Sequence, residues 1–322
     1  SADETDKRCE LILSMQAHGL KKRISHTYAK TAVIGISGGL DSTLALLVCV
    51  NAMKLLDRPM TDIVAVTMPC FGTTKRTKSN AVKICEALGV TLREIDITDS
   101  VKQHFKDIEH DINDLSVVFE NGQARERTKV LMNVANQTGG LVIGTGDLSE
   151  LALGWATYNG DHMSMYGVNC SIPKTLIKHL VSYYSKTTGN KLLKESLEDI
   201  LDTPVSPELL PANGDEISQK TEDLVGPYEL HDFFLYNGIR WGFTPEKVFR
   251  LALYTFDGIY DRETILKWLK TFYRRFFSQQ FKRSCLPDGP KVGSVTLSPR
   301  GDWRMPSDAC ATLWLSQIEN LK

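Results

Sequence analysis

The sequence has almost no net charge, and this limits the partners that the protein can have. Its 322 residues contain 38 lysines and arginines against 39 aspartates and glutamates, so the formal net charge is −1 and the isoelectric point lies near 6.7. A protein that binds nucleic acid over a broad face usually carries a clear basic excess. The composition therefore disfavours nucleic acid as the main partner, while a local basic patch stays open.

Long apolar runs and paired cysteines are also missing. No uninterrupted apolar stretch reaches about 18 residues, which predicts that the chain does not span a membrane. The acidic start, Ser1–Asp6, differs from the basic start of a signal peptide. The seven cysteines are scattered without a C-x-x-C pair, and the apolar surroundings of Cys49 and Cys85 are typical of reduced, buried thiols. These features predict a cytoplasmic protein.

Apolar runs and helical patterns alternate through the first half of the chain. We expect strands at Ala32–Ser37, Asp62–Met68, Thr91–Ile97 and Gly140–Gly144, and helices at residues 6–29, Asp41–Leu56, Arg76–Leu88 and Ala124–Gln137. Strands that alternate with helices are typical of a parallel sheet with helices on both faces. The predicted fold class is therefore α/β, with a doubly wound and mostly parallel sheet.

The second half follows a different pattern. Residues 145–174 are rich in Gly, Asn and Tyr and are predicted to form a long functional loop. Helices are expected at Pro173–Lys186, Pro245–Leu253 and Arg262–Phe277, and ordered coil at Leu286–Asp308. We expect loops at Asp202–Gly226 and around Lys282, and one or both of them should order when nucleotides bind. The proline-containing, acidic segment Asp202–Gly226 is the better candidate, because it offers little apolar surface to bury. The alternative is a permanently ordered surface loop.

The most informative segment is Ser37-Gly-Gly-Leu-Asp-Ser42, between the first strand and its helix. Open α/β sheets bind ligands at such turns. The free N–H groups at the start of a helix favour phosphate, and glycine lets the backbone approach it closely. A bare carboxylate, Asp41, would repel phosphate unless Mg²⁺ joined the two. The alternative is a tight turn in which Asp41 caps the helix. Neither the Walker loop nor the G-x-G-x-x-G fingerprint fits this segment.

This segment resembles the SGGxDS signature of the N-type ATP pyrophosphatases, which cleave ATP to AMP and pyrophosphate. Further segments narrow the resemblance to NAD synthetase, in particular to the synthetase half of the glutamine-dependent form. They are Phe119–Arg127, the stretch Gly144-Thr-Gly-Asp-Leu-Ser-Glu-Leu-Ala-Leu-Gly-Trp-Ala-Thr-Tyr158, Asn169–Lys174 and Ser298–Asp308. The resemblance implies an adenine-nucleotide α-hydrolase-like, Rossmann-like fold. It also implies a synthetase domain over residues 31–322 after a lead-in helix at 1–30, without the upstream glutaminase domain.

The resemblance implies a reaction as well. Deamido-NAD would be amidated to NAD through an acyl-adenylate, with ATP as co-substrate, Mg²⁺ as cofactor, and AMP and pyrophosphate as products. Without the glutaminase domain, we expect this chain to use ammonia. The family further implies a homodimer, and a glutaminase domain in the full-length protein.

Site residues are carried over from the family position by position. Asp41 and Glu150 are expected to be catalytic and to bind the metal. The residues expected to bind ATP are Gly35, Ile36, Ser37, Gly38, Gly39, Leu40, Asp41, Ser42, Thr145, Lys174 and Ser206. Those expected to bind deamido-NAD are Asn121, Arg125, Glu150, Trp155, Ala156, Thr157, Tyr158 and Lys282.

Each assignment has a simpler alternative. Asp147 and Glu150 could form a capping box that opens a helix. Arg125, Lys282 and Arg283 could be solvated surface charges, and the aromatic residues Trp155 and Tyr158 could belong to the core. At the level of the whole chain, the alternatives are another N-type ATP pyrophosphatase, such as GMP synthetase or a tRNA-modifying enzyme, and a nucleotide-binding module without catalysis. The joint presence of Asp41 and Glu150 argues against the last of these.

Overall fold

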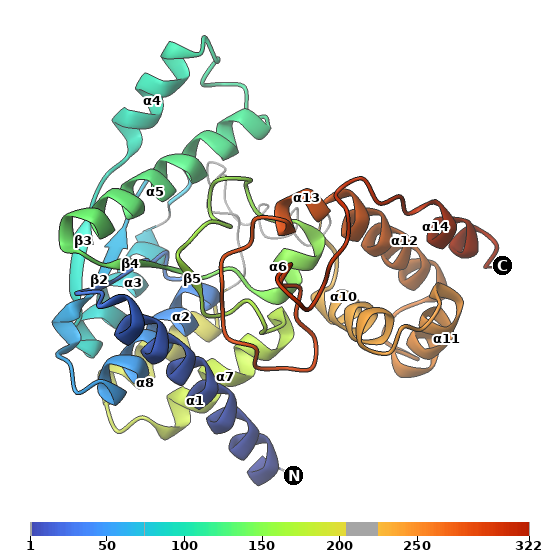
Figure 1. Cartoon of the computed structure of the whole chain (residues 1–322), viewed down its shortest axis with the longest axis horizontal. Helices are drawn as coiled ribbons and strands as arrows, with labels where there is room; N and C mark the ends of the chain where they lie inside the picture. Colours follow the sequence, from blue (N-terminus) through green and yellow to red (C-terminus); the bar gives the residue numbers. More distant parts are fainter. Residues whose placement is uncertain (1, 74, 204–224, 322) are drawn as a thin grey trace.

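A five-stranded, entirely parallel sheet forms the centre of the computed structural model, which describes residues 2–73, 75–203 and 225–321 (Figure 1). The strand order is β3-β2-β1-β4-β5. The strands are β1 (Ala32–Gly35), β2 (Ile63–Thr67), β3 (Thr91–Glu94), β4 (Leu141–Gly144) and β5 (Tyr166–Gly167). The predicted α/β class and parallel sheet are confirmed.

Helices cover both faces of the sheet, because alternate strand residues point to opposite sides. Val33 and Val142 pack with α4 and α5, whereas Ile34 and Ile143 pack with α1, α2, α7 and α8. The bounds of these helices are α1 Ala2–Thr27, α2 Leu40–Leu55, α3 Lys75–Leu88, α4 Thr98–Asp107, α5 Val117–Thr138, α7 Lys174–Thr187 and α8 Lys191–Leu201. The doubly wound arrangement is therefore confirmed.

A second group of helices lies apart from the sheet, on the right in Figure 1, and has its own aromatic core. These helices are α10 (Tyr228–Leu235), a π-helical turn (Tyr236–Arg240), α11 (Pro245–Thr255), α12 (Arg262–Ser278), α13 (Gln280–Arg283) and α14 (Thr312–Glu319). The short helix α6 (Leu148–Leu153) lies between this group and the sheet (Figure 1). Leu148, Ala152 and Leu153 on α6 pack into the aromatic core. Helix α6 thus follows strand β4 in the chain, while its buried side chains pack against the second group of helices.

Several predicted elements need correction. Residues 145–174 are not only loop, since they contain α6 and β5. Helix α5 begins at Val117 rather than at Ala124, and the strands are shorter than expected, because the residues beyond them turn into the loops that bear the site. The sequence patterns also failed to predict α4, α8, α10 and α14. Coil over Leu286–Asp308 is confirmed.

The topology places one crevice at the carboxyl edge of the sheet. Strand β1 pairs with both β2 and β4, so the chain leaves β1 toward one half of the sheet and leaves β4 toward the other. Ligands of open α/β sheets bind where neighbouring connections diverge in this way. The turn after β1 carries Ser37–Ser42, and the turn after β4 carries Thr145–Asp147. Within the described residues, no helix is long and apolar enough to cross a membrane.

Candidate active site

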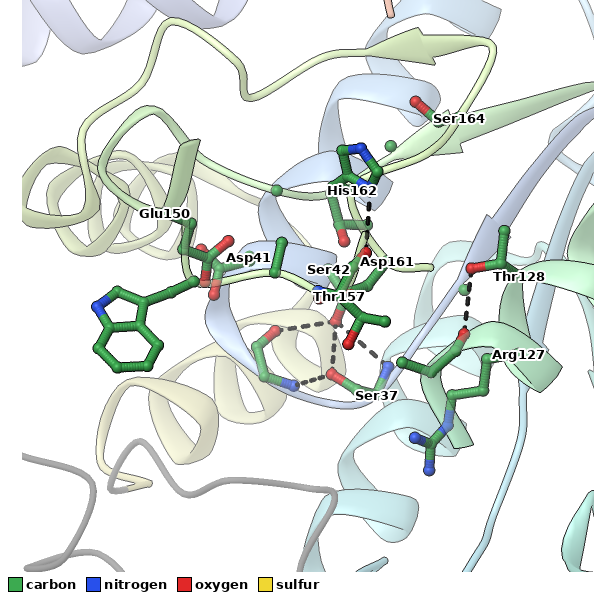
Figure 2. Close-up of a pocket in the computed structure, with 18 of the residues that line it drawn as sticks. Ser37, Asp41, Ser42, Arg127, Thr128, Glu150, Thr157, Asp161, His162 and Ser164 are labelled. Atoms are coloured by element: carbon green, nitrogen blue, oxygen red, sulfur yellow. Dashed lines mark hydrogen bonds between the residues drawn. The ribbon is translucent and has the colours of Figure 1, made fainter. Parts of the chain in front are cut away.

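The glycine turn after β1 is closed by its own two serines. The Gly39 N–H donates to Ser37 Oγ at 3.2 Å, the Ser37 N–H donates to Ser42 Oγ at 3.3 Å, and Ser42 Oγ–H donates to the Gly39 carbonyl at 3.1 Å. Figure 2 draws the contact between the two serine side chains. Gly38 has a φ of +88°, which a side chain would strain. The turn thus holds the first N–H groups of α2 toward the crevice.

Asp41 does not cap helix α2. The N-cap of this helix is Gly39, which has no side chain to accept a hydrogen bond, and Asp41 lies in the first helical turn. Instead its two carboxylate oxygens accept hydrogen bonds from Lys174 Nζ at 3.0 and 2.9 Å. The capping alternative for Asp41 is therefore wrong, and the carboxylate faces the crevice.

Glu150 both caps a helix and faces the site. Asp147, the N-cap of α6, accepts the Glu150 N–H at 2.8 Å, and Glu150 Oε2 accepts the Asp147 N–H at 3.3 Å. The other oxygen, Glu150 Oε1, accepts a hydrogen bond from Lys174 Nζ at 2.8 Å. The capping box is confirmed, and it fixes Glu150 beside Asp41, as Figure 2 shows.

Three carboxylates surround one ammonium group. Oxygen atoms of Asp41, Asp147 and Glu150 lie within 4.8 Å of one another, and Lys174 Nζ also lies 2.9 Å from Asp147 Oδ2. Burial raises the pKa of Asp147 and of Glu150, and Lys174 acts in the opposite direction. Burial lowers the pKa of Lys174, but the three acids outweigh it and hold this pKa well above its usual value. Three carboxyl groups therefore share one ammonium group.

Buried polar side chains lock the elements that carry this cluster. Asn169 is fully buried, and its amide donates to the carbonyls of Asp41 at 3.0 Å and Thr145 at 3.1 Å. Asp232 on α10 accepts from Ser149 Oγ–H and, at 3.0 Å, from the Thr175 N–H. The sequence analysis did not predict Asn169 or Asp232 as site residues, and it did not predict that Asp147 lies beside Asp41 and Glu150. Asn169 lies in one of the family-like segments, whereas Asp232 sits in an ordinary helical pattern.

The glycine turn, Asp41, Glu150 and Lys174 line one cavity of about 700 Å³. The predicted site residues that line it are Gly35, Ile36, Ser37, Gly38, Gly39, Leu40, Asp41, Ser42, Asn121, Thr145, Glu150, Trp155, Ala156, Thr157, Lys174 and Lys282. Arg127, Tyr228 and Arg275 also line it and were not assigned from the sequence. The cavity reaches from the carboxyl edge of the sheet to α12 and α13, and its volume lies within the usual range of small-molecule pockets.

Two predicted site residues, Arg125 and Tyr158, do not line the cavity. Arg125 and Tyr158 are exposed, and Arg125 Nε–H donates to the Tyr158 carbonyl at 3.2 Å. Ser206, with most of the segment Asp202–Gly226, lies outside the described residues. The segment around Lys282 is not a loop, since it forms α13.

Two cationic side chains, Lys282 and Arg283, donate hydrogen bonds to backbone carbonyls at the C-terminal end of α6. Lys282 Nζ donates to the carbonyls of Gly154 at 2.7 Å and Ala156 at 2.6 Å, so it is no surface charge. Arg283 is buried and donates to the carbonyls of Leu151 at 3.0 Å and Ala152 at 2.8 Å. A helix ends with unpaired carbonyls, which attract cations. The surface alternative is therefore wrong for both residues.

Comparison with known proteins shows the family of the chain. The profile of the NAD synthase family matches residues 12–239. The chain belongs to the NAD synthase family. A glutamine-dependent NAD(+) synthetase of Mycobacterium leprae is 45% identical over 335 residues, which are 97% of this chain and 49% of that relative. The chain thus spans about half the length of this NAD synthase relative, and the resemblance read from the sequence is confirmed.

Solved structures agree on the fold of this NAD synthase family member. A glutamine-dependent NAD(+) synthetase from Cytophaga hutchinsonii superposes with a TM-score of 0.76 at 18% identity, covering 97% of this chain and 56% of that one. An NMN synthetase from Francisella tularensis superposes with a TM-score of 0.61 at 21% identity, covering 87% and 95%. At these identities the likeness shows the fold, which is adenine-nucleotide α-hydrolase-like as predicted.

Proposed function

We propose that this chain is the synthetase part of an NAD synthetase, which amidates deamido-NAD to NAD at the expense of ATP, with ammonia as nitrogen donor. The observation that carries the proposal is the single cavity in which the glycine turn faces Asp41, Glu150 and Lys174. An anion-binding turn beside buried carboxylates suits phosphates together with a metal ion, and the family supplies the substrate class.

The acidic cluster fits Mg²⁺. Its donors are carboxylate oxygens, which Mg²⁺ prefers. The side chain of Asp147 is completely buried, and its Oδ2 has the ammonium of Lys174 beside it but no hydrogen-bond donor in bonding geometry. Asp41 and Glu150 would hold the ion, with Asp147 next to them. When bound, it would neutralise charge on the phosphates of ATP.

The chain's own residues would position the phosphates. The first N–H groups of α2, with the hydroxyls of Ser37 and Ser42, would bind the pyrophosphate end of ATP. Lys174, on the first turn of α7, would contact the phosphates from the other side of the crevice. The carboxylate of deamido-NAD would then attack the α-phosphorus, and pyrophosphate would leave. Ammonia would attack the acyl-adenylate, and AMP would leave. Catalysis here consists of positioning and charge stabilisation.

Deamido-NAD would occupy the rest of the cavity. Thr157 Oγ–H donates to Asn121 Oδ1 at 2.7 Å, which joins the stretch after α6 to α5. Trp155 and Ala156 line the wall that follows. Arg125 and Tyr158 remain predicted contacts outside the cavity lining. We further propose a homodimer in the cytoplasm, and a glutaminase domain that supplies ammonia in the full-length protein.

NAD formation from deamido-NAD and ATP tests the proposal. We expect NAD with ammonium as nitrogen source, none with glutamine alone, and pyrophosphate release that requires deamido-NAD. Nicotinate mononucleotide and xanthosine monophosphate serve as competing acceptors, because the fold also occurs in an NMN synthetase. A preference for either acceptor would replace the proposed substrate. Tight ATP binding without any turnover would indicate a module without catalysis.

A further inference from the structure

Helix α12 presents a cation, Arg275, to the cavity near the C-terminal end of α6. Its Nε–H donates to the carbonyl of Leu153 at 2.8 Å, and its guanidinium lies over the Trp155 ring, 3.6 Å from the ring centre. The hydrogen bond and the ring together fix the plane and position of the guanidinium. Arg275 is therefore an anchored group in the cavity wall.

The two Nη groups of Arg275 have no hydrogen-bond or ion-pair partner among the described residues. Burial lowers the pKa of Arg275, and the neighbouring charge of Arg274 adds to this. Lys282 stands close enough for its own pKa to be lowered, first by burial and then by Arg275. A half-buried cation without an anion is costly, so this arrangement calls for a negatively charged partner.

The two cations differ in what they can still bind. Lys282 already donates to the carbonyls of Gly154 and Ala156, at 2.7 and 2.6 Å. Arg275 donates its Nε–H to the Leu153 carbonyl, and its two Nη groups have no partner among the described residues. A guanidinium fork matches the two oxygens of a carboxylate, and the indole beside it suits a flat aromatic ring. The ligand that fits both features is an aromatic carboxylate.

We propose that Arg275 binds the nicotinate carboxylate of deamido-NAD and that this contact distinguishes the acid substrate from the amide product. The inference rests on the proposed function and deepens it. Lys282, which the resemblance assigns to deamido-NAD binding, donates to the backbone on both sides of Trp155. The carboxylate is the only charge that the reaction removes from the nicotinic ring. Its conversion to an amide leaves Arg275 without an anion and weakens binding of the product.

The position of Arg275 suits this role. The backbone N–H of Trp155 donates to the carbonyl of Glu150 at 3.0 Å. Trp155 therefore lies about one helical turn from the acidic cluster. An acid held there lies beside the phosphates that Asp41 and Glu150 would serve. The same helix, α6, therefore spaces the carboxylate subsite from the proposed ATP site.

Calorimetric titration of deamido-NAD and NAD into the chain tests the inference. We expect the unchanged protein to bind deamido-NAD more tightly than NAD, and Arg275→Gln to lose about tenfold or more of that preference. Arg275→Lys keeps the charge without the fork and should retain an intermediate preference. Arg274→Gln is the matched control, because this neighbour on α12 is exposed and should leave the preference unchanged.

A purely structural role for Arg275 would weaken both ligands equally. An unchanged preference in Arg275→Gln, or equal losses for deamido-NAD and NAD, would overturn the inference while NAD synthesis by the unchanged protein stood. If Arg275→Gln does not fold, Arg275→Lys decides in the same way. Failure of the unchanged protein to bind deamido-NAD would refute the proposed function, and this inference with it.

Discussion

The two ends of helix α6 carry opposite charges. At the N-terminal end, Asp147 and Glu150 form a capping box and meet Asp41 around Lys174. At the C-terminal end, three cations from α12 and α13 donate to the carbonyls of residues 151–154 and 156. Acids near a helix N-terminus and cations near its C-terminus both interact favourably with the helix dipole.

The two ends differ in what they leave unsatisfied. At the acidic end three carboxyl groups share one lysine, and carboxylate oxygens are the ligands that Mg²⁺ prefers. At the cationic end, each nitrogen of the Arg283 guanidinium donates to a partner, whereas the Nη groups of Arg275 have none within the part of the chain that the structure describes. One six-residue helix thus separates a site for ATP and metal from a site for an organic anion, as we propose.

The largest effect is expected from Asp41→Asn at the acidic end. Asparagine is nearly isosteric but lacks the charge that would hold the metal, so pyrophosphate release should fall by about a thousandfold or more. Circular dichroism and pyrophosphate release on the same sample provide the measurement. Asp57→Asn, at the exposed far end of α2, is the matched control. Near-normal pyrophosphate release by Asp41→Asn would show that the Asp41 charge is not needed for catalysis.

Lys174→Met removes the cation that the three acids share. An uncompensated buried charge typically costs about 3 kcal/mol or more of unfolding free energy. Burial already raises the pKa of Asp147 and of Glu150, so the folded state binds protons more readily than the unfolded chain. Stability conferred by these acids is therefore greatest at low pH and is lost as the pH rises through their folded-state pKa values.

Without Lys174 these pKa values rise further, so the unfolding free energy of Lys174→Met should decrease more steeply from about pH 4 upward. Urea unfolding at pH 5 and pH 8 measures this slope. Lys178→Met, on the exposed side of α7, should behave like the unchanged protein. Identical slopes for Lys174→Met and Lys178→Met would show that the ammonium does not hold the acids.

Arg283→Met tests the cationic end and should give the smallest effect. The variant leaves the carbonyls of Leu151 and Ala152 without their buried donor, which should cost about 2 kcal/mol of unfolding free energy. Thermal unfolding provides the measurement, with Arg274→Met as the exposed control on the neighbouring helix. A melting temperature equal to that of the control would mean that water replaces Arg283 at the end of α6.

The sequence alone determined the α/β class and the position of the glycine turn, because these depend on local patterns. Apolar runs such as Ala32–Gly35 must be buried, and adjacent glycines between a strand and a helix indicate a tight turn. The family-like segments also located most residues that line the cavity. Element bounds were less certain, since the start of α5 depends on packing against α4 and β1.

Only the tertiary structure decided which charges meet. Asp41 and Lys174 are 133 residues apart, and Arg275 lies 122 residues from the carbonyl that it holds. Local sequence could not tell whether Asp41 caps a helix or faces a lysine. It also could not show that Lys282 donates to two backbone carbonyls, whereas Arg275 donates only its Nε–H among the described residues. An isolated carboxylate or guanidinium is compatible with solvent, a cap or a ligand. The choice depends on the burial and the opposite charges that the fold brings to it.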